Sequence, residues 1–328
     1  MIGSASRTGV VVIGRNEGER LRRCLRSVLA KASQVVYVDS GSTDGSVPMA
    51  RDLGCQVVEL DLQLPFTAAR ARNLGFERLH ELMPDLQYVQ FVDGDCEVVE
   101  GWLDTAACFL DGHPEVAVVC GRRREMHPDS SIYNLLCDIE WNTPVGETKS
   151  CGGDALMRAQ AFAAAKGYRA SLIAGEEPEL CLRLRGSGWR IWRLNSEMTL
   201  HDAAMTRFHQ WWKRAMRAGY ACAEGAALHG ASPERHRIRE TRSIWFWGLG
   251  VPALSAASSL VAGPVGLGWL ALYPPQVVRL AFQGSGSARE NWWRALFLVL
   301  GKFPEVLGQL KFTRDRLFAV RSRLIEYK

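Results

Sequence analysis

Short hydrophobic runs alternate with amphipathic segments along the N-terminal part of the chain. Runs rich in β-branched and aromatic residues predict four strands, at Gly9–Ile13, Gln34–Val38, Cys55–Leu60 and Tyr88–Val92. Apolar residues at helical spacing predict helices at Glu19–Lys31, Val47–Leu53 and Ala68–Leu82. Strands that alternate with helices favour a doubly wound α/β sheet, in which ligands bind at the carboxyl ends of the strands.

Acidic residues follow two of these predicted strands. Asp93-Gly94-Asp95 closes the run Tyr88–Val92, and Asp39 follows Gln34–Val38. Two carboxylates beside a glycine provide hard oxygen ligands for a divalent cation, which can in turn hold a diphosphate. The alternative is a simple turn, because Asp-Gly pairs are common at strand ends. We expect both acidic segments to converge on the ligand crevice of the sheet.

A polar loop that contains glycine runs from Asp39 to Ser46, ahead of the second predicted helix. It is either a plain strand–turn–helix connection or a nucleoside-binding loop. In the second case a carboxylate accepts from the base or ribose, and the helix N-terminus favours anions. The loop lacks the Gly-Lys-Ser/Thr of a Walker A motif and is not a GxGxxG segment.

A second acidic cluster, Glu176-Glu177 followed by Glu179, precedes a predicted helix. One interpretation is an acidic first helical turn that complements the helix dipole. The other is a general base, because neighbouring negative charge raises the pKa of a carboxylate that takes a proton from a hydroxyl.

Composition narrows the possible partners. The net charge is +5, and much of the excess lies in Arg122–Arg124 and between Arg235 and Arg242. This pattern favours an anionic small substrate or a membrane surface, and we expect no nucleic-acid partner. The nine cysteines form no CxxC pair, so we expect reduced core thiols. The first seven residues lack the features of a secretory signal, and we expect none.

The C-terminal third changes character. No charged residue occurs from Ser243 to Val278, and arginines precede and follow this stretch. It suits two short helices with a turn at Ala262–Gly266, both ends on the cytoplasmic face of a membrane. The alternative is a pair of helices buried in the fold or in a dimer interface. The stretch Gln210–Arg214 before it predicts an amphipathic, Trp-rich helix at a membrane interface.

Taken in order, six segments resemble the family 2 inverting glycosyltransferases with a GT-A fold, over roughly Gly9 to His201. They are Val12–Glu17, Val38–Gly45, Ala71–Gly75, Asp93–Asp95, Gly152–Asp154 and Gly175–Glu177. The resemblance implies a GT-A nucleotide-diphospho-sugar transferase domain, a doubly wound mixed sheet, at residues 1–205. We expect an amphipathic interfacial segment at 206–242 and an apolar helical hairpin with basic C-terminal helices at 243–328.

The resemblance also implies roles for individual residues. Mn²⁺ or Mg²⁺ would be bound by Asp93 and Asp95, with Asp95 as the direct ligand and His201 nearby, although a lone histidine is more often structural. Glu177 stands where the family usually has aspartate and would be the catalytic base, with Glu176 as the alternative. The nucleotide-sugar pocket would contain Asn16, Glu17, Asp39, Ser42, Asp44, Arg72, Asp93, Gly94 and Gly153.

The activity that this resemblance implies is transfer of one sugar, with inversion, from a nucleotide donor, for which we expect a UDP-sugar. The acceptor would be a hydroxyl of a lipid-linked saccharide in cell-surface polysaccharide synthesis. We expect the protein at the inner or plasma membrane with its catalytic domain in the cytoplasm. The alternatives are a polyprenyl-phosphate sugar synthase and a non-catalytic scaffold that binds a nucleotide sugar. The oligomeric state stays open.

Overall fold

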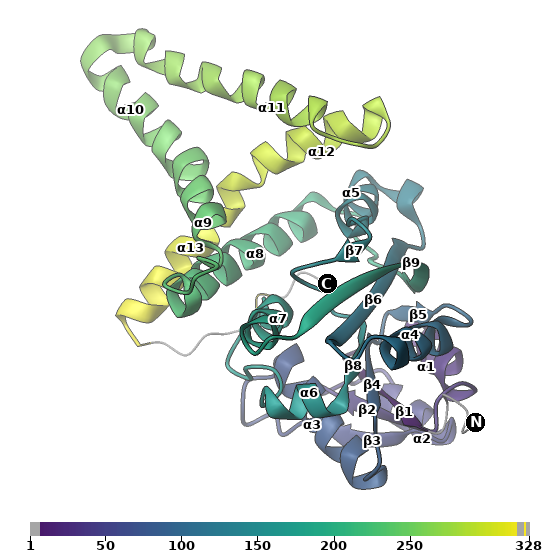
Figure 1. The fold of residues 1–328 in the computed structure, drawn as a ribbon. Coiled ribbons are helices and arrows are strands. Elements are labelled where there is room, and N and C mark those ends of the chain that lie inside the picture. Colours follow the sequence, from purple (N-terminus) through teal and green to yellow (C-terminus); the bar gives the residue numbers. More distant parts are fainter. Residues whose placement is uncertain (1–6, 320–324, 326–328) are drawn as a thin grey trace. The chain divides into compact units, whose positions relative to one another are not determined.

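A computed structural model describes residues 7–319 and residue 325 (Figure 1). The chain divides into two compact units. The sheet unit comprises the chain up to Met126 together with Trp141–Ala203, and the helical unit comprises His127–Glu140 and the chain from Ala204 onward. Each unit is described by itself.

The sheet unit is built on one mixed sheet, whose order over the described residues is β3-β2-β1-β4-β8-β6-β9-β5, with β7 paired to β9. Strands β3, β2, β1 and β4 are parallel to one another, and β8 runs antiparallel to both β4 and β6. The strands are β1 (Thr8–Gly14), β2 (Gln34–Asp39), β3 (Gln56–Glu59), β4 (Tyr88–Asp93), β5 (Cys96–Val98), β6 (Val116–Glu125), β7 (Gly146–Glu147), β8 (Ala155–Arg158) and β9 (Arg190–His201).

Helices connect the strands of this unit. They are α1 (Glu19–Leu29), α2 (Ser46–Asp52), α3 (Ala68–Leu82), α4 (Trp102–Gly112), α6 (Ala159–Ala164) and α7 (Glu176–Gly186). The four predicted strands and three predicted helices are confirmed, and the bounds of α3 agree with the prediction at both ends. The predicted mixed α/β fold is therefore confirmed, because the parallel half follows from the alternation of strands and helices.

Strand β1 lies at the centre of the parallel half, and its residues Val10, Val11 and Val12 are fully buried. Burial on both faces is expected where helices cover a parallel sheet. Its register with β2 and β4 pairs Gly14 with Asp39 and Ile13 with Asp93. Both aspartates therefore end their strands at the same edge of the sheet, as the sequence predicted.

Helix α3 packs closely on this sheet at Gly75. A Cβ atom at that position would lie 2.3 Å from Cγ1 of Val11 and 2.9 Å from Cγ2 of Val38. These distances are shorter than any ordinary carbon–carbon contact, and both neighbours are fully buried. The absence of a side chain at Gly75 therefore sets the distance between helix and sheet.

We expect Gly75→Ala to lower the free energy of unfolding by about 1–3 kcal/mol, because overpacking a rigid core forces its neighbours out of place. Urea unfolding followed by circular dichroism measures the change. Gly112→Ala is the matched control, because nothing lies within 4 Å of a Cβ atom at the end of α4. Equal stability of the two variants would contradict this account of the α3 packing.

The helical unit contains α5 (Ile132–Trp141, of which Trp141 belongs to the sheet unit), preceded by the 3₁₀ turn η2 (Pro128–Ser130). It continues with α8 (Phe208–His229), α9 (Ile238–Trp245), the π-helical turn η3 (Phe246–Gly250), α10 (Val251–Ala262), η4 (Gly263–Leu272), α11 (Tyr273–Phe282), α12 (Ala288–Leu300) and α13 (Lys302–Leu317). Helix α8 contains the predicted Trp-rich segment. Its Trp211 is buried, with its ring edge-on to Phe297 at 4.9 Å between centroids, so this side chain belongs to the interior of the unit.

The uncharged stretch forms two helical limbs joined by a turn (Figure 1). Helix α10 ends at Ala262, and the direction changes at Gly263, whose φ of +62° lies in the region that favours glycine. The turn is therefore inside the predicted range Ala262–Gly266. Among the described residues, Ile238–Phe282 is the one helical run long and apolar enough to cross a membrane by length and composition, and 22% of its most apolar window is buried.

Candidate active site

The carboxylate of Asp39 organises the loop after β2. Its Oδ2 accepts hydrogen bonds from the backbone N–H groups of Gly41 and Ser42 at 2.8 and 2.7 Å. Its Oδ1 accepts from the hydroxyl of Tyr37 at 2.7 Å, and the side chain is buried. A carboxylate has about four acceptor positions, so these three bonds fix the loop and leave room for about one more donor.

The loop after β1 is joined to the loop after β2. Asn16 has a left-handed backbone with φ of 54°, its N–H donates to Oγ of Ser42, and its Oδ1 accepts from the N–H of Thr43. Asp44 accepts from both the N–H and the hydroxyl of Ser46 at the start of α2. The side chains of Asn16, Ser42 and Asp44 thus hold the two loops in one arrangement at the edge of the sheet.

Arg72, on α3, links the two acidic segments that the sequence singled out. Its guanidinium is buried, and its two Nη atoms each lie 2.7 Å from a carboxylate oxygen, one of Asp93 and one of Glu176. Gly153 lies against this pair, because a Cβ atom there would be 2.9 Å from Oδ2 of Asp93 and 3.0 Å from Nη2 of Arg72. Arg72, Asp93, Gly153 and Glu176 therefore form one cluster.

Asp93 is held between two guanidiniums. Burial raises the pKa of this carboxyl, but Arg72 and Arg123 outweigh burial and keep the pKa well below its usual value. Arg123 also pairs with Asp154 at 2.6 Å, and Asp154 accepts from the N–H of Asp93 and the hydroxyl of Thr199. Asp93 is therefore ionised, and its position is fixed by Arg72 on α3, Arg123 on β6 and Asp154 just before β8.

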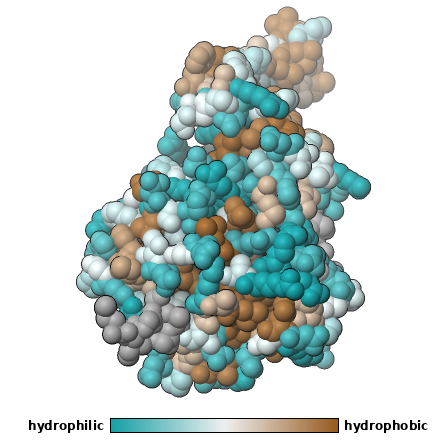
Figure 2. Space-filling view, turned by 90° about the vertical axis from the view of Figure 1, so that its right-hand side faces the viewer, coloured by the Kyte–Doolittle hydropathy of each residue, from teal (hydrophilic) through white to brown (hydrophobic). Residues whose placement is uncertain are grey.

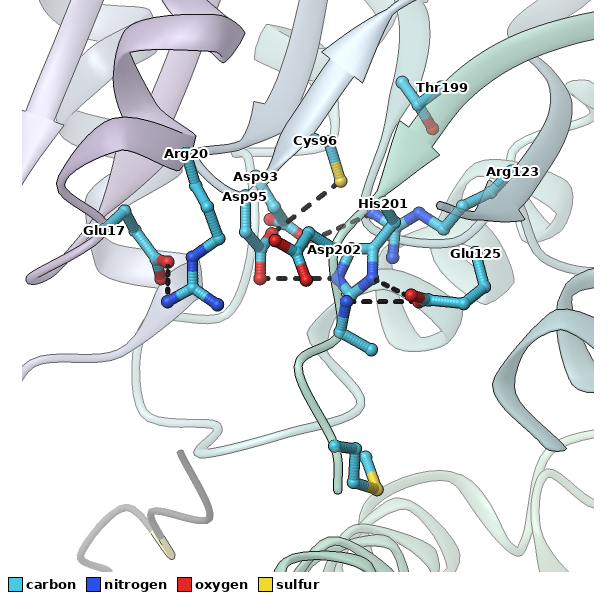
Figure 3. Close-up of polar contacts among 12 residues, drawn as sticks. Glu17, Arg20, Asp93, Asp95, Cys96, Arg123, Glu125, Thr199, His201 and Asp202 are labelled. Atoms are coloured by element: carbon cyan, nitrogen blue, oxygen red, sulfur yellow. Dashed lines mark hydrogen bonds and ion pairs between the residues drawn. The ribbon is translucent and has the colours of Figure 1, made fainter. Parts of the chain in front are cut away.

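Asp95 lies in the turn just before β5, and His201 is the last residue of β9. The two side chains face each other (Figure 3). Nε2 of His201 lies 3.4 Å from Oδ2 of Asp95, and its Nδ1 lies 3.6 Å from Oε2 of Glu125. Trp141 lies edge-on to the imidazole at 4.6 Å between centroids. Burial lowers the pKa of His201, which favours the neutral imidazole.

This pair fits a divalent cation. A carboxylate oxygen and a neutral imidazole nitrogen are donors that Mn²⁺ accepts, and a carboxylate on the far side of the imidazole is the usual partner of a metal-binding histidine. Asp95, Cys96 and His201 bring possible ligand atoms within 4.8 Å of one another, whereas Asp93 belongs to a separate group with Cys96 and Asp154.

Glu17 lies near this edge but is paired locally. Its Oε2 is 2.7 Å from Nη2 of Arg20, on the first turn of α1 (Figure 3). A Cβ atom at Gly94 would lie 3.5 Å from Cγ of Glu17 and 3.0 Å from the carbonyl oxygen of Ile13. Gly94 therefore allows the Asp93–Asp95 segment to pass close to the loop that carries Glu17.

Glu177, at the start of α7, points into a buried group of cysteines. Its Oε1 accepts from the N–H of Cys151 at 2.5 Å and from the thiol of Cys181 at 3.0 Å. Burial raises the pKa of Cys181 to about 11, so its thiol keeps the proton that it donates. Burial also raises the pKa of Glu177, against the lowering effect of these hydrogen bonds. Of the two glutamates, Glu176 is paired with Arg72 and Glu177 has no cationic partner among its hydrogen bonds.

Three site residues escaped the sequence analysis. Arg123 lies in the basic run Arg122–Arg124, Asp154 ends the segment Gly152–Asp154, and no sequence pattern singles out Glu125. The sequence feature that could have indicated two of them is the spacing along β6. Arg123 and Glu125 are two residues apart, so their side chains lie on the same face of the strand. Arg123 pairs with Asp154, which lies in the loop just before β8, and Glu125 lies beside His201 of β9. Strands β8 and β9 are the neighbours of β6 in the sheet.

Known proteins resemble this chain in both sequence and fold. Residues 9–157 match the description Glycosyl transferase family 2. The chain carries a glycosyl transferase family 2 domain. "Glycosyltransferase AglE" of Haloferax volcanii is 27% identical over 111 residues, 31% of this chain and 35% of its own length. "Uncharacterized glycosyltransferase YibD" of Escherichia coli is 30% identical over 128 residues, 34% of this chain and 36% of its own length. The match thus spans about a third of these relatives.

Solved structures share the fold over nearly the whole chain. The mannosyltransferase PcManGT of Pyrobaculum calidifontis, solved with GDP-Man and Mn²⁺, has a TM-score of 0.59 at 18% identity, covering 94% of this chain and 88% of its own. Residues 1–349 of TarS from S. aureus have a TM-score of 0.51 at 14% identity, covering 95% and 92%. At such identities the likeness concerns the fold, and the predicted GT-A fold is confirmed.

Proposed function

We propose that the protein is a metal-dependent, inverting glycosyltransferase that moves one sugar from a nucleotide donor to a hydroxyl of a lipid-linked saccharide. The observation that carries the proposal is the cluster at the carboxyl edge of the sheet. There the ionised Asp93 and its neighbour Asp95 lie in the part of the chain that matches the family, and His201 pairs with Asp95 from the end of β9. A scaffold needs no such group of buried ionisable side chains, since their burial is costly.

The nucleoside would bind over the joined loops after β1 and β2. Asp39 keeps an acceptor position for a base or ribose donor, and Asn16, Ser42 and Asp44 hold that carboxylate's loop in place. Glu17 and Gly94 would border the same pocket. A preformed loop loses little conformational entropy on binding, which favours donor affinity.

The diphosphate would lie at the acidic edge, where Mn²⁺ or Mg²⁺ bound by Asp95 and His201 would neutralise the charge of the leaving group. Asp93 would act beside the metal through its fixed position between Arg72 and Arg123. Gly153 packs directly against Asp93 and Arg72, so that even a Cβ atom there would crowd their polar atoms. UDP is the nucleotide we expect, and GDP is the alternative because PcManGT was solved with GDP-Man.

Glu177 would be the general base. A carboxylate with a raised pKa and no cationic partner is a better proton acceptor than one paired with a guanidinium, as Glu176 is with Arg72. Direct attack of the acceptor hydroxyl on the anomeric carbon, with its proton passing to Glu177, forms the new glycosidic bond. The bond to the diphosphate breaks in the same displacement, so the anomeric configuration inverts.

The acceptor would be reached at a membrane. The exposed apolar run in the helical unit supports association with the inner or plasma membrane, and we place the catalytic domain in the cytoplasm, where nucleotide sugars are made. A lipid-linked saccharide used in cell-surface polysaccharide synthesis is an acceptor suited to that location.

We expect the detergent-purified protein to release a nucleoside diphosphate from one class of donor, with Mn²⁺ present, and to lose this activity in EDTA. The measurement is diphosphate release from UDP-, GDP- and dTDP-sugars, repeated with added lipid-linked acceptor. Full turnover in EDTA would remove the metal from the mechanism. No release from any donor, even with acceptor lipids, would favour a protein that only binds nucleotide sugars.

A further inference from the structure

The hairpin formed by α10 and η4 (Val251–Leu272) presents apolar side chains on its outer surface. Leu260 and Val261 at its tip are each 90% exposed, and Val265 is 79% exposed. Along both limbs further large side chains are exposed, namely Leu254, Leu267, Trp269, Leu270 and Leu272. Hydrophobic surface gathers at the top of the view in Figure 2, where these elements lie. Scattered single apolar residues are normal on a protein surface, whereas a continuous apolar patch of this kind marks an interaction surface.

Two serine hydroxyls of α10 donate to carbonyl groups within the hairpin. The hydroxyl of Ser255 donates to the carbonyl of Gly266 at 3.2 Å, and that of Ser258 donates to the carbonyl of Leu254. Gly266 makes the close approach possible, because a Cβ atom there would lie 2.2 Å from the backbone nitrogen of Ser259. The hairpin thus directs apolar side chains outward and hydrogen bonds inward, as a lipid environment requires.

The base of the hairpin is fixed to the rest of the helical unit. Gly248 packs on α13, where a Cβ atom would lie 2.2 Å from the carbonyl oxygen of Lys302. The hydroxyl of Tyr273 donates to the carbonyl of Trp247 at 2.6 Å and closes the base, and Phe303 of α13 contacts the Tyr273 ring. The segment between Trp247 and Tyr273 is therefore the part of the hairpin that extends beyond these contacts and could insert into a different environment.

The distribution of charged residues indicates that this environment is a lipid bilayer. No Asp, Glu, Lys, Arg or His occurs from Ser243 to Val278, and Arg242 and Arg279 lie just outside this range. Arginines at the base of an uncharged, exposed hairpin complement the anionic headgroups of a bilayer. Trp247 and Tyr273, at the base, are the residue types enriched at the level of the headgroups.

The length of the free limbs limits the depth. From Gly248 to Ala262 one limb has 15 residues, which at about 1.5 Å per residue reach ~22 Å, whereas the hydrocarbon core is ~30 Å thick. We propose that this hairpin enters one leaflet of the bilayer and turns back within it, with its base at the headgroups. The inference deepens the membrane association proposed above and rests on that part alone, not on the donor chemistry.

The first test is flotation of the full-length protein with vesicles of phosphatidylcholine and phosphatidylglycerol. We expect Leu260→Asp/Val261→Asp to lower the vesicle partition coefficient by roughly 100-fold, because two carboxylates would have to enter hydrocarbon. Leu317→Asp, at an exposed position on α13, should leave it unchanged. Equal partitioning of the tip variant and the wild type would overturn the proposal. Diphosphate release in detergent is measured on the same samples, so loss of membrane binding and failure of the proposed chemistry are separate results.

The second test measures depth with a fluorescent amino acid incorporated at position 261. Quenching by lipids that carry a nitroxide near the chain ends, without quenching by iodide enclosed in the vesicles, supports entry into one leaflet. Quenching by the enclosed iodide would show that the tip crosses the bilayer and would overturn the proposal. Quenching by external iodide would show that the hairpin lies on the surface, which would also overturn it.

Discussion

Replacing Glu177 by glutamine is expected to lower the turnover of sugar transfer by roughly 100- to 10,000-fold, the usual range for loss of a general base. Glutamine keeps the size of the side chain and can still accept hydrogen bonds from the Cys151 N–H and the Cys181 thiol. Donor affinity should therefore stay close to that of the wild type. Turnover with donor and acceptor, together with calorimetric donor binding, separates the two effects.

Glu176→Gln is the informative partner variant. It removes a charge from Arg72 and leaves that buried guanidinium with Asp93 as its remaining close ion-pair partner, so we expect weaker donor binding and a smaller fall in turnover. Glu81→Gln, at an exposed position on α3, serves as the surface control. If Glu176→Gln abolishes turnover and Glu177→Gln does not, the base assignment is reversed.

The same base predicts a pH dependence. Because burial raises the pKa of Glu177, the residue loses its proton only above the ordinary range of a glutamate. Activity should be present above this raised pKa and fall as the pH drops through it, and the acidic limb should be absent from the residual activity of Glu177→Gln. If Glu177→Gln is fully active, a phosphate acceptor is favoured, because a phosphate nucleophile needs little help from a base.

The sequence predicted the parallel half of the sheet well, because its strands and helices are formed by consecutive segments of the chain. Each strand from β1 to β4 is followed or preceded by a helix, and the β-branched run of β1 is long enough to identify by itself. The order of β8, β6 and β9 was out of reach. These strands are neighbours through pairings that bring together residues far apart in the chain, such as Glu125 with His201.

The site was predictable where a motif sits at the end of a strand, as Asp39 and Asp93 do. It was not predictable where a side chain is held by distant partners. Nothing near Arg123 in the sequence indicates that it pairs with Asp93 and Asp154, and nothing near Glu177 indicates the cysteines around it. Spatial partners of a motif depend on the sheet order, which single-sequence patterns do not determine.

Asp95→Asn and His201→Gln are each expected to weaken Mn²⁺ binding by at least about 100-fold, since loss of a direct ligand should exceed the 10- to 100-fold effect of an outer-shell partner. The two side chains face each other at 3.4 Å from separate segments, Asp95 from the turn before β5 and His201 from the end of β9. Electron paramagnetic resonance of Mn²⁺, titrated into protein with a nucleoside diphosphate, measures this affinity without requiring activity.

Cys96→Ala is the matched control, because its thiol lies in the same group but is a soft ligand that Mn²⁺ does not prefer. Burial raises the pKa of Cys96 well above its usual value, so the thiol stays protonated, donates weakly to Oδ1 of Asp95 at 3.7 Å and should not act as a ligand. Unchanged Mn²⁺ affinity in both Asp95→Asn and His201→Gln would move the cation away from this pair. The separate group of Asp93 and Asp154 is then the next site to examine, although there the two carboxylates are already partly neutralised by Arg123, which pairs with both, and by Arg72, which pairs with Asp93. That neutralisation is the reason we assign the cation to Asp95 and His201: a carboxylate that balances a guanidinium has less negative charge to offer a second cation.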